Sequence, residues 1–100
     1  MYIILWEYYV KPDKQNEFKD AYSPSGAWAE LFKKGNGYAG TELIRSPENL
    51  THYITIDRWA SQDAYEAFLS HWLAEYKELD LHCEDLTQHE SSLGRFEALS

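Results

Sequence analysis

Apolar and polar residues alternate with the period of a β-strand in three parts of the chain. Residues 2–10, YIILWEYYV, are rich in β-branched and aromatic side chains and place mostly apolar residues on both faces. A strand that is apolar on both sides is typical of one that is covered on both sides. Residues 39–46 and 51–59 predict two more strands, and the PENL turn between them makes these strands antiparallel neighbours.

The stretch HYITIDRWAS, residues 52–61, alternates without presenting a plainly polar face. A half-exposed strand is normally apolar on one side and polar on the other. The side chains here divide into two sets, with His52, Ile54, Ile56 and Arg58 on one side and Tyr53, Thr55, Asp57 and Trp59 on the other. We therefore expect both sides to be covered, although the alternation does not determine which side lies under helices.

Two helical regions are predicted, one between the first and second strands and one after the third. Residues 13–22 carry a one-sided apolar stripe with Asp13 as a cap, and a helix restarts at Ser23 and Pro24 and ends at Gly35. Ser61 caps the most strongly amphipathic helix, which the spacing extends to about Leu79. Its apolar stripe consists of Tyr65, Phe68, Leu69, Trp72, Leu73 and Tyr76. Residues 86–96 predict a fourth strand, against which the polar TQHESS and Gly94 argue.

The predicted order is strand, helix, strand, strand, helix, strand. This is the ferredoxin-like β-α-β-β-α-β pattern of the α+β class, with one antiparallel sheet and helices on one of its faces. We expect a single domain over residues 1–100. The other face of the sheet has little polar surface to offer water, so we expect a second copy of the chain to cover it and form a homodimer.

Composition narrows the classes of function. The chain is 44% hydrophobic and 16% aromatic, more than a core of 100 residues easily holds, so some aromatic side chains should line a cavity or an interface. A net charge of -8 argues against nucleic-acid and membrane partners. The single cysteine, Cys83, allows no internal disulfide. With no signal peptide or spanning segment expected, the predicted location is the cytoplasm.

The segments GYAGTELI and HYITIDRWASQDAYEAF resemble the antibiotic biosynthesis monooxygenase family. VKPDKQNEF after the first strand and DLTQHESSLGRF in the last extend the resemblance over nearly the whole chain. It implies ferredoxin-like domains that pair through their sheets into a dimeric α/β barrel. It also implies cofactor-free oxygenation of polycyclic phenols or quinols. One branch of the family degrades haem, but the comparable places here hold Trp6 and Phe68 and no suitable histidine follows, which argues against that activity.

Cofactor-free oxygenation needs a dry aromatic pocket, a group that takes a proton from the substrate, and hydrogen-bond donors for the developing oxyanion. Candidate walls, between helices and sheet, are Trp6, Tyr8, Trp28, Phe32, Trp59, Phe68 and Trp72. The alternative for each is ordinary core packing. Candidate catalytic residues are Glu7, His52, Asp57 and His71. The alternative for the acids is a structural ion pair, to which Arg45 could contribute, and for His71 an inert surface position.

No metal site is expected, because the four histidines lie far apart and no metal-binding spacing occurs. Cys83 lacks a basic activator. Three readings remain open. The first is a cofactor-free monooxygenase acting on a small aromatic phenol or quinol. The second is a non-catalytic dimer that binds a small aromatic or hydrophobic ligand or has a stress-related role. The third is a structural dimer whose pocket is filled by its own side chains.

Overall fold

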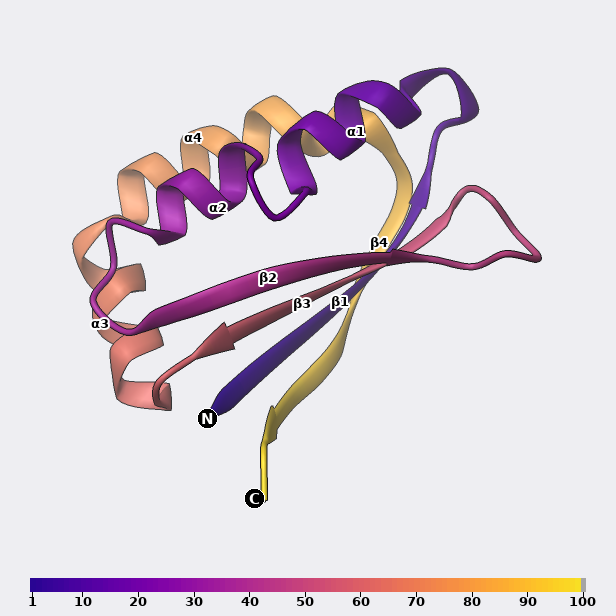
Figure 1. The fold of residues 1–100 in the computed structure, drawn as a ribbon. Helices are drawn as coiled ribbons and strands as arrows, with labels where there is room; N and C mark the ends of the chain where they lie inside the picture. Colours follow the sequence, from indigo (N-terminus) through magenta and orange to yellow (C-terminus); the bar gives the residue numbers. More distant parts are fainter. Residues whose placement is uncertain (100) are drawn as a thin grey trace.

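Strand β1 (Tyr2–Val10) lies inside the sheet and pairs antiparallel with β3 (His52–Trp59) and with β4 (Thr87–Glu97). Strand β2 (Tyr38–Arg45) pairs antiparallel with β3, so the spatial order is β2-β3-β1-β4 (Figure 1). The computed structural model describes residues 1–99, and residue 100 of the predicted domain lies outside them. The ferredoxin-like α+β prediction is confirmed by this strand order and its antiparallel pairing.

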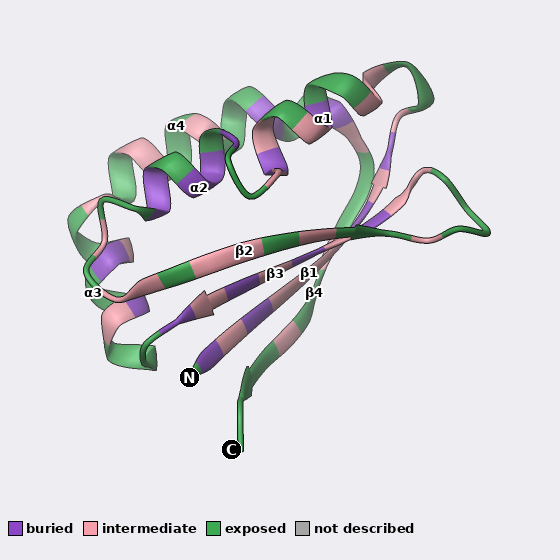
Figure 2. Cartoon of the chain, viewed as in Figure 1, coloured by how far each residue is buried: buried purple, intermediate pink, exposed green. Residues whose placement is uncertain are grey.

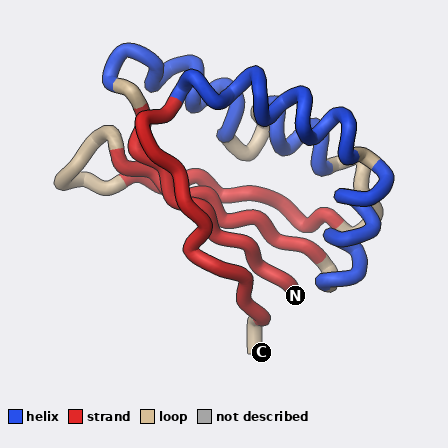
Figure 3. The backbone as a smooth tube through the Cα atoms, turned by 180° about the vertical axis from the view of Figure 1, so that it is seen from behind, coloured by secondary structure: helices blue, strands red, loops and turns tan. Residues whose placement is uncertain are grey.

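Helices α1 (Gln15–Tyr22), α2 (Ala27–Phe32), α3 (Gln62–His71) and α4 (Leu73–Cys83) follow the predicted order and cover one face of the sheet (Figures 1 and 3). Short 3-10 turns, Pro12–Lys14 and Glu84–Leu86, precede α1 and β4. Among residues 1–99, no helix combines the length and the hydropathy needed to cross a bilayer.

Three helix boundaries differ from the prediction. Asp13 lies in a 3-10 turn and does not cap α1. The second helix begins at Ala27, after Gly26, whose backbone is extended and lies so close to the backbone of Asp20 and Ala21 that a Cβ would come within 2.8 Å of it. The long helix breaks at Trp72, whose ψ of 26° departs from the helical value, and continues as α4 to Cys83. The Ser61 cap is confirmed, since its hydroxyl accepts a hydrogen bond from the Ala64 amide at 3.1 Å.

The structure decides which side of β3 lies under the helices. Burial alternates strictly along the strand, with Tyr53, Thr55, Asp57 and Trp59 buried and the intervening residues half-buried (Figure 2). In β1 the same alternation buries Tyr2, Ile4, Tyr8 and Val10. The side of the sheet away from the helices, here called the open face, therefore carries Ile3, Leu5, Glu7 and Tyr9 of β1 and His52, Ile54, Ile56 and Arg58 of β3.

The fourth strand forms at Thr87–Glu97 despite its polar sequence. It is an edge strand, paired only with β1 within the described residues, so its outer side chains meet solvent and tolerate polar residues. A shift of register between Leu5 and Trp6 lies beside Gly94, which weakens pairing locally without ending the strand.

The core is built mainly from aromatic rings. Trp59, Phe32 and Phe68 form a triangle with ring centroids 5.1–5.7 Å apart, and Trp59 has no exposed surface. Gly35, the residue predicted to end the second helix, packs against this triangle. A Cβ at Gly35 would meet Phe68 Cδ1 and Trp59 Cζ3 at 2.9 Å. Neither ring has room to withdraw, because both are buried.

We therefore expect Gly35→Ala to lower the free energy of unfolding by about 1–3 kcal/mol, the usual effect of overpacking a filled core. Urea denaturation followed by tryptophan fluorescence measures the change. Asn36→Ala, at the exposed neighbouring position, is the control and should stay within about 0.5 kcal/mol of the unmodified chain. Equal stability of the two variants would show that the core accommodates the added methyl group.

Candidate functional site

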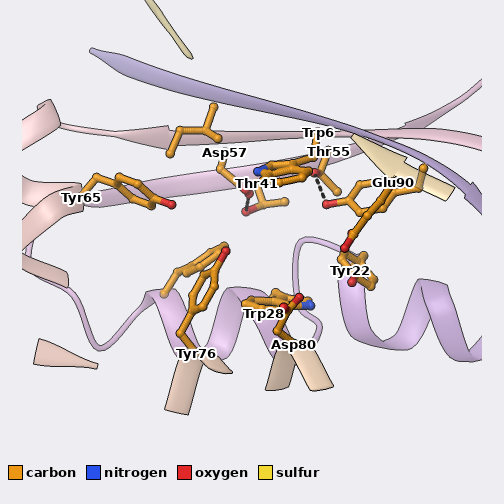
Figure 4. A pocket seen from close by; sticks show the side chains of 13 residues that line it. Trp6, Tyr22, Trp28, Thr41, Thr55, Asp57, Tyr65, Tyr76, Asp80 and Glu90 are labelled. Atoms are coloured by element: carbon orange, nitrogen blue, oxygen red, sulfur yellow. Dashed lines mark hydrogen bonds between the residues drawn. The ribbon is translucent and has the colours of Figure 1, made fainter. Parts of the chain in front are cut away.

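A cavity of about 120 Å³ lies between the sheet and the helices. All eight helices and strands of residues 1–99 contribute side chains to its walls (Figure 4). The lining residues are Ile4, Trp6, Tyr8, Tyr22, Trp28, Phe32, Thr41, Thr55, Asp57, Tyr65, Tyr76, Asp80 and Glu90. A cavity is therefore present beneath the helices, and the third reading, a pocket filled by its own side chains, does not describe this molecule.

Aromatic rings form most of the walls. Figure 4 shows Trp6 on the sheet side, facing Trp28 and Tyr76 on the helix side. Trp28 and Tyr76 meet edge-on with ring centroids 5.1 Å apart, and Tyr22 packs 4.9 Å from Tyr8. An apolar cavity of about 150 Å³ takes up benzene, so a cavity of this size accommodates one aromatic ring.

Asp57 is the most deeply buried of the carboxyl groups that line this cavity. Only 8% of its surface is exposed, and it lies directly opposite Thr41 in the β2–β3 register. The Thr41 hydroxyl donates to Asp57 Oδ1 at 2.6 Å. Burial raises the pKa of Asp57 from its ordinary value of 3.8 to about 6, against the opposing effect of the Thr41 hydrogen bond. A carboxyl group with this pKa accepts and releases a proton near neutral pH.

A line of hydroxyl groups leads away from Asp57. Because Thr41 donates its proton to Asp57, the hydroxyl of Tyr38, 2.5 Å from Thr41 Oγ1, must donate to Thr41. Tyr38 is partly exposed. The other oxygen of Asp57 receives no hydrogen bond from residues 1–99 and is free to act on a molecule in the cavity.

The tyrosines of the cavity are neutral donors. The hydroxyls of Tyr8 and Thr55 lie 3.0 Å apart in a buried hydrogen bond. Burial raises the pKa of Tyr8, of Tyr22 and of Tyr76 well above the ordinary value. These phenols therefore keep their protons in the physiological range and can donate hydrogen bonds to an anionic oxygen.

Two further carboxyl groups lie at the more exposed part of the cavity. Asp80 comes from α4 and Glu90 from β4, and both residues are exposed. Desolvation, followed by the charge of Asp80, raises the pKa of Glu90. Neither residue was singled out by the sequence pattern, because Asp80 falls in a polar stretch of the helix and Glu90 within TQHESS.

Of the predicted wall residues, Trp6, Tyr8, Trp28 and Phe32 line the cavity. The prediction was wrong for Trp59, Phe68 and Trp72, which are absent from its lining. Trp59 and Phe68 instead fill the core beside Phe32, and Trp72 lies at the helix break with the Lys34 ammonium 5.0 Å from its ring. Helical spacing identifies a buried stripe, but it does not separate core from cavity wall.

Of the predicted catalytic residues, only Asp57 lines the cavity. Glu7 and His52 lie together on the open face, where Glu7 Oε2 is 2.8 Å from His52 Nε2 and the His52 ring stacks on Tyr9. The alternative of an ion pair is therefore supported for Glu7, with His52 rather than Arg45 as partner. His71 is exposed at the end of α3. These positions follow from the face of the strand on which each residue lies and from the helix break, and Asp57 is the one predicted catalytic residue among those that line the cavity.

His, Cys, Asp and Glu are the side chains that most often hold a metal ion in proteins. Among residues 1–99, no three His, Cys, Asp or Glu side chains are arranged to hold a metal ion. Cys83 is buried, and desolvation raises the pKa of its thiol, so it is held in its unreactive protonated form.

Comparisons with solved structures agree on the fold. An antibiotic biosynthesis monooxygenase from Nitrosomonas europaea has 17% sequence identity and a TM-score of 0.76, with all of both chains covered. A protein of the same description from Bordetella bronchiseptica has 19% identity and a TM-score of 0.76, covering 99% of this chain and 97% of that one. SnoaB, a cofactor-independent oxygenase from Streptomyces nogalater, has 20% identity and a TM-score of 0.72, covering 99% of this chain and 93% of SnoaB.

At these identities the structural likeness shows the fold alone, and no curated protein sequence matches the chain. The family itself is shown by sequence. The profile described as antibiotic biosynthesis monooxygenase matches residues 1–78, a span that includes β1, β2, β3 and most of the helical layer. The chain therefore belongs to the antibiotic biosynthesis monooxygenase family.

Proposed function

We propose that this protein is a cofactor-independent monooxygenase that oxidises a small phenol or quinol in the cavity beneath its helices, with Asp57 as the base. The observation that carries the proposal is a buried carboxyl group, with a pKa of about 6, inside a cavity walled by aromatic rings. Family membership supports the reaction class, and a structural neighbour, SnoaB, is described as a cofactor-independent oxygenase.

The reaction converts one phenol and one dioxygen into one quinone and one water. Asp57 takes the hydroxyl proton and leaves an electron-rich ring anion. One electron passes to dioxygen, and the ring radical and superoxide then combine to form a carbon–oxygen bond at an unsubstituted ring carbon. The resulting peroxide takes back the proton from Asp57. Loss of the proton on that carbon breaks the oxygen–oxygen bond and leaves a second carbonyl and hydroxide, which becomes water with the released proton.

The surrounding residues supply what this sequence of steps needs. The free oxygen of Asp57 faces the substrate, while Thr41 and Tyr38 connect the carboxyl group to the partly exposed edge of β2. In the hydrogen-bonded pair of Tyr8 and Thr55, the hydroxyl that accepts from the other keeps its own proton free to donate to the peroxide oxygen. The aromatic walls exclude water and so preserve the reactive ring anion.

We further propose that two copies pair through their open faces in the cytoplasm. Within this face Ile54 lies opposite Ile44 of β2, and Ile3 lies opposite Phe96 of β4. Ile44 is 45% exposed and Phe96 is 50% exposed in a single chain. Side chains directly opposite each other in an antiparallel pair share one face, so these residues form an apolar surface that a second sheet would cover.

The role of Asp57 is tested by Asp57→Asn. We expect oxygen uptake with hydroquinone to fall about a hundredfold or more, because the amide cannot accept the proton. In the unmodified chain the rate should decrease as the pH falls below about 6, where Asp57 becomes protonated. An oxygen electrode measures both effects. A rate that Asp57→Asn leaves unchanged would remove Asp57 from the mechanism.

The stability of the same variant separates loss of chemistry from loss of fold. Because the pKa of Asp57 is raised on folding, the native state binds its proton more tightly than the unfolded chain, and stability falls as the pH rises from about 4 to about 6. At neutral pH this cost is roughly 3 kcal/mol. Asp57→Asn lacks the titrating group and should unfold at a higher urea concentration than the unmodified chain at pH values above about 6.

The volume of the cavity limits the size of the substrate that it can hold. The unmodified chain should oxidise hydroquinone but not the three-ring anthrone, since about 120 Å³ holds one ring. Trp6→Ala removes an indole from the wall and should admit anthrone while raising the KM for hydroquinone. Trp72→Ala removes an indole outside the cavity and is the matched control. Oxidation of anthrone by the unmodified chain at the same rate as hydroquinone would contradict this size limit.

Pairing through the open face predicts the effect of a charge at its centre. Ile56→Lys should convert the dimer into single copies, because the ammonium would be buried without a partner. Ala67→Lys, at an exposed position of α3, adds the same charge elsewhere and should leave the dimer intact. Sedimentation velocity at micromolar concentration distinguishes the two species. An unmodified chain that sediments as a single copy would rule out this dimer.

A further inference from the structure

We propose that the cavity selects a substrate that carries a positive charge, a single phenolic ring bearing a protonated amine. This inference deepens the proposed function and rests on it for the claim that the bound molecule is a substrate. The selection itself follows from the charges and rings that line the cavity.

The charged side chains lining the cavity are all acidic. Asp57, Asp80 and Glu90 are among its thirteen lining residues, and no lysine, arginine or histidine is. Asp57 is more than nine-tenths buried, and one of its oxygens accepts no hydrogen bond within residues 1–99. A buried carboxylate oxygen that accepts no hydrogen bond is costly unless a donor reaches it, and the hydroxyl of a bound phenol supplies that donor to Asp57.

Lys33 and Arg95 are engaged away from these acids. In contrast, the charge of His89, next to Glu90 in β4, lowers the pKa of Glu90 against the larger effects of burial and of Asp80. Lys33 donates to Glu30 at 2.9 Å, and neither residue lines the cavity. Arg95 places its guanidinium 5.2 Å from the centre of the Tyr65 ring and donates to the Tyr2 hydroxyl. These contacts hold Lys33 and Arg95 outside the cavity wall, and no basic residue is among the thirteen that line it, so an ammonium ligand meets negative charge there.

The aromatic walls add a second attraction for a cation. Trp6, Trp28 and Tyr76 present ring surfaces from the sheet and helix sides (Figure 4). Cations are attracted to ring faces, most strongly to tryptophan, and the attraction increases where water is excluded. The same surroundings disfavour an anionic ligand, since a carboxylate would meet both the acids and the negative ring faces.

The acidic lining of the cavity also affects the proposed proton transfer from the phenol. Removal of the phenol proton creates a ring anion in a cavity whose acids would repel it. An ammonium group on the same molecule offsets that repulsion. Figure 4 shows Asp57 on the sheet side and Asp80 on the helix side, with Glu90 beside the cavity. The phenol is thus placed at Asp57, and the ammonium at Asp80 and Glu90, which are the more exposed carboxyl groups.

A matched set of ligands that differ only in charge tests the selection. Benzylamine, benzyl alcohol and benzoate are titrated into the protein without oxygen at neutral pH, and their affinities are measured by calorimetry. We expect the protonated amine to bind about tenfold more tightly than the alcohol, and benzoate to bind more weakly than either. The preference for the amine should weaken as salt is added, because the outer carboxyl groups are partly exposed.

Two variants locate the interaction. Asp80→Asn and Glu90→Gln should each weaken binding of the amine by about threefold while leaving the alcohol unchanged, because each removes one partly screened charge. Glu78→Gln removes a charge from the same helix at a position outside this cavity and should change neither affinity. Both acidic positions are exposed, so the substitutions leave the core unaltered.

The proposal is overturned if the amine binds no more tightly than the alcohol, if benzoate binds best, if none of the three binds, or if Glu78→Gln acts as strongly as Asp80→Asn. If the protein is not an oxygenase but the charge selection holds, the amine binds selectively and neither an amine-bearing nor a neutral quinol consumes oxygen. If neutral quinols are oxidised and the amine binds no more tightly than the alcohol, the proposed monooxygenase function stands and the preference for a cation is rejected.

Discussion

The rest of this structure depends on which face of the sheet each residue of the two central strands, β1 and β3, points to. Successive side chains point to opposite faces, so a shift of one residue in the β1–β3 pairing would exchange the two faces of a strand. In the observed register Tyr8 lies opposite Tyr53 and Trp6 opposite Thr55, which places both pairs under the helices. The same register sends Glu7, His52, Ile54 and Ile56 to the open face.

The cavity exists because the helical layer is held away from the centre of the sheet by large rings. Trp59, Phe32 and Phe68 fill the space near one end, and Phe18, Tyr8 and Tyr22 pack together with centroids 4.3–5.1 Å apart. Between these clusters Asp57, Thr41 and Thr55 bring polar atoms into the layer. A polar group at the centre of an apolar layer costs stability unless it is satisfied, and its retention is typical of a functional site.

Electrostatics connects the chemistry of the site with its selectivity. Burial, rather than a neighbouring acid, is the main cause of the raised pKa of Asp57, and this makes the group a base near neutral pH. Asp80 and Glu90 add negative charge at the more exposed part of the cavity, where the charge of His89 offsets that of Glu90 only in part. The proposed reaction forms an anion in a cavity lined by acids, and the proposed cationic substituent on the substrate would offset that repulsion.

Much of this architecture was determined by the sequence alone. Alternating β-branched and aromatic residues predicted the first three strands, while the fourth was predicted against its polar sequence. The Ser61 cap and the Tyr65–Phe68 spacing predicted α3, and the aromatic excess predicted a cavity or an interface. These signals are local, since they depend on residues within one strand or one helical turn. The candidate walls Trp6, Tyr8, Trp28 and Phe32 were found in the same way.

Only the tertiary structure decided which candidates meet. Alternation is symmetric between two apolar faces, so it did not separate Asp57 from Glu7 or His52. The contact between Asp57 and Thr41 depends on the register of β2 and β3. Asp80 and Glu90, at the more exposed part of the cavity, come from α4 and from the edge strand β4. Such convergence depends on packing between segments distant in the chain, which no local pattern encodes.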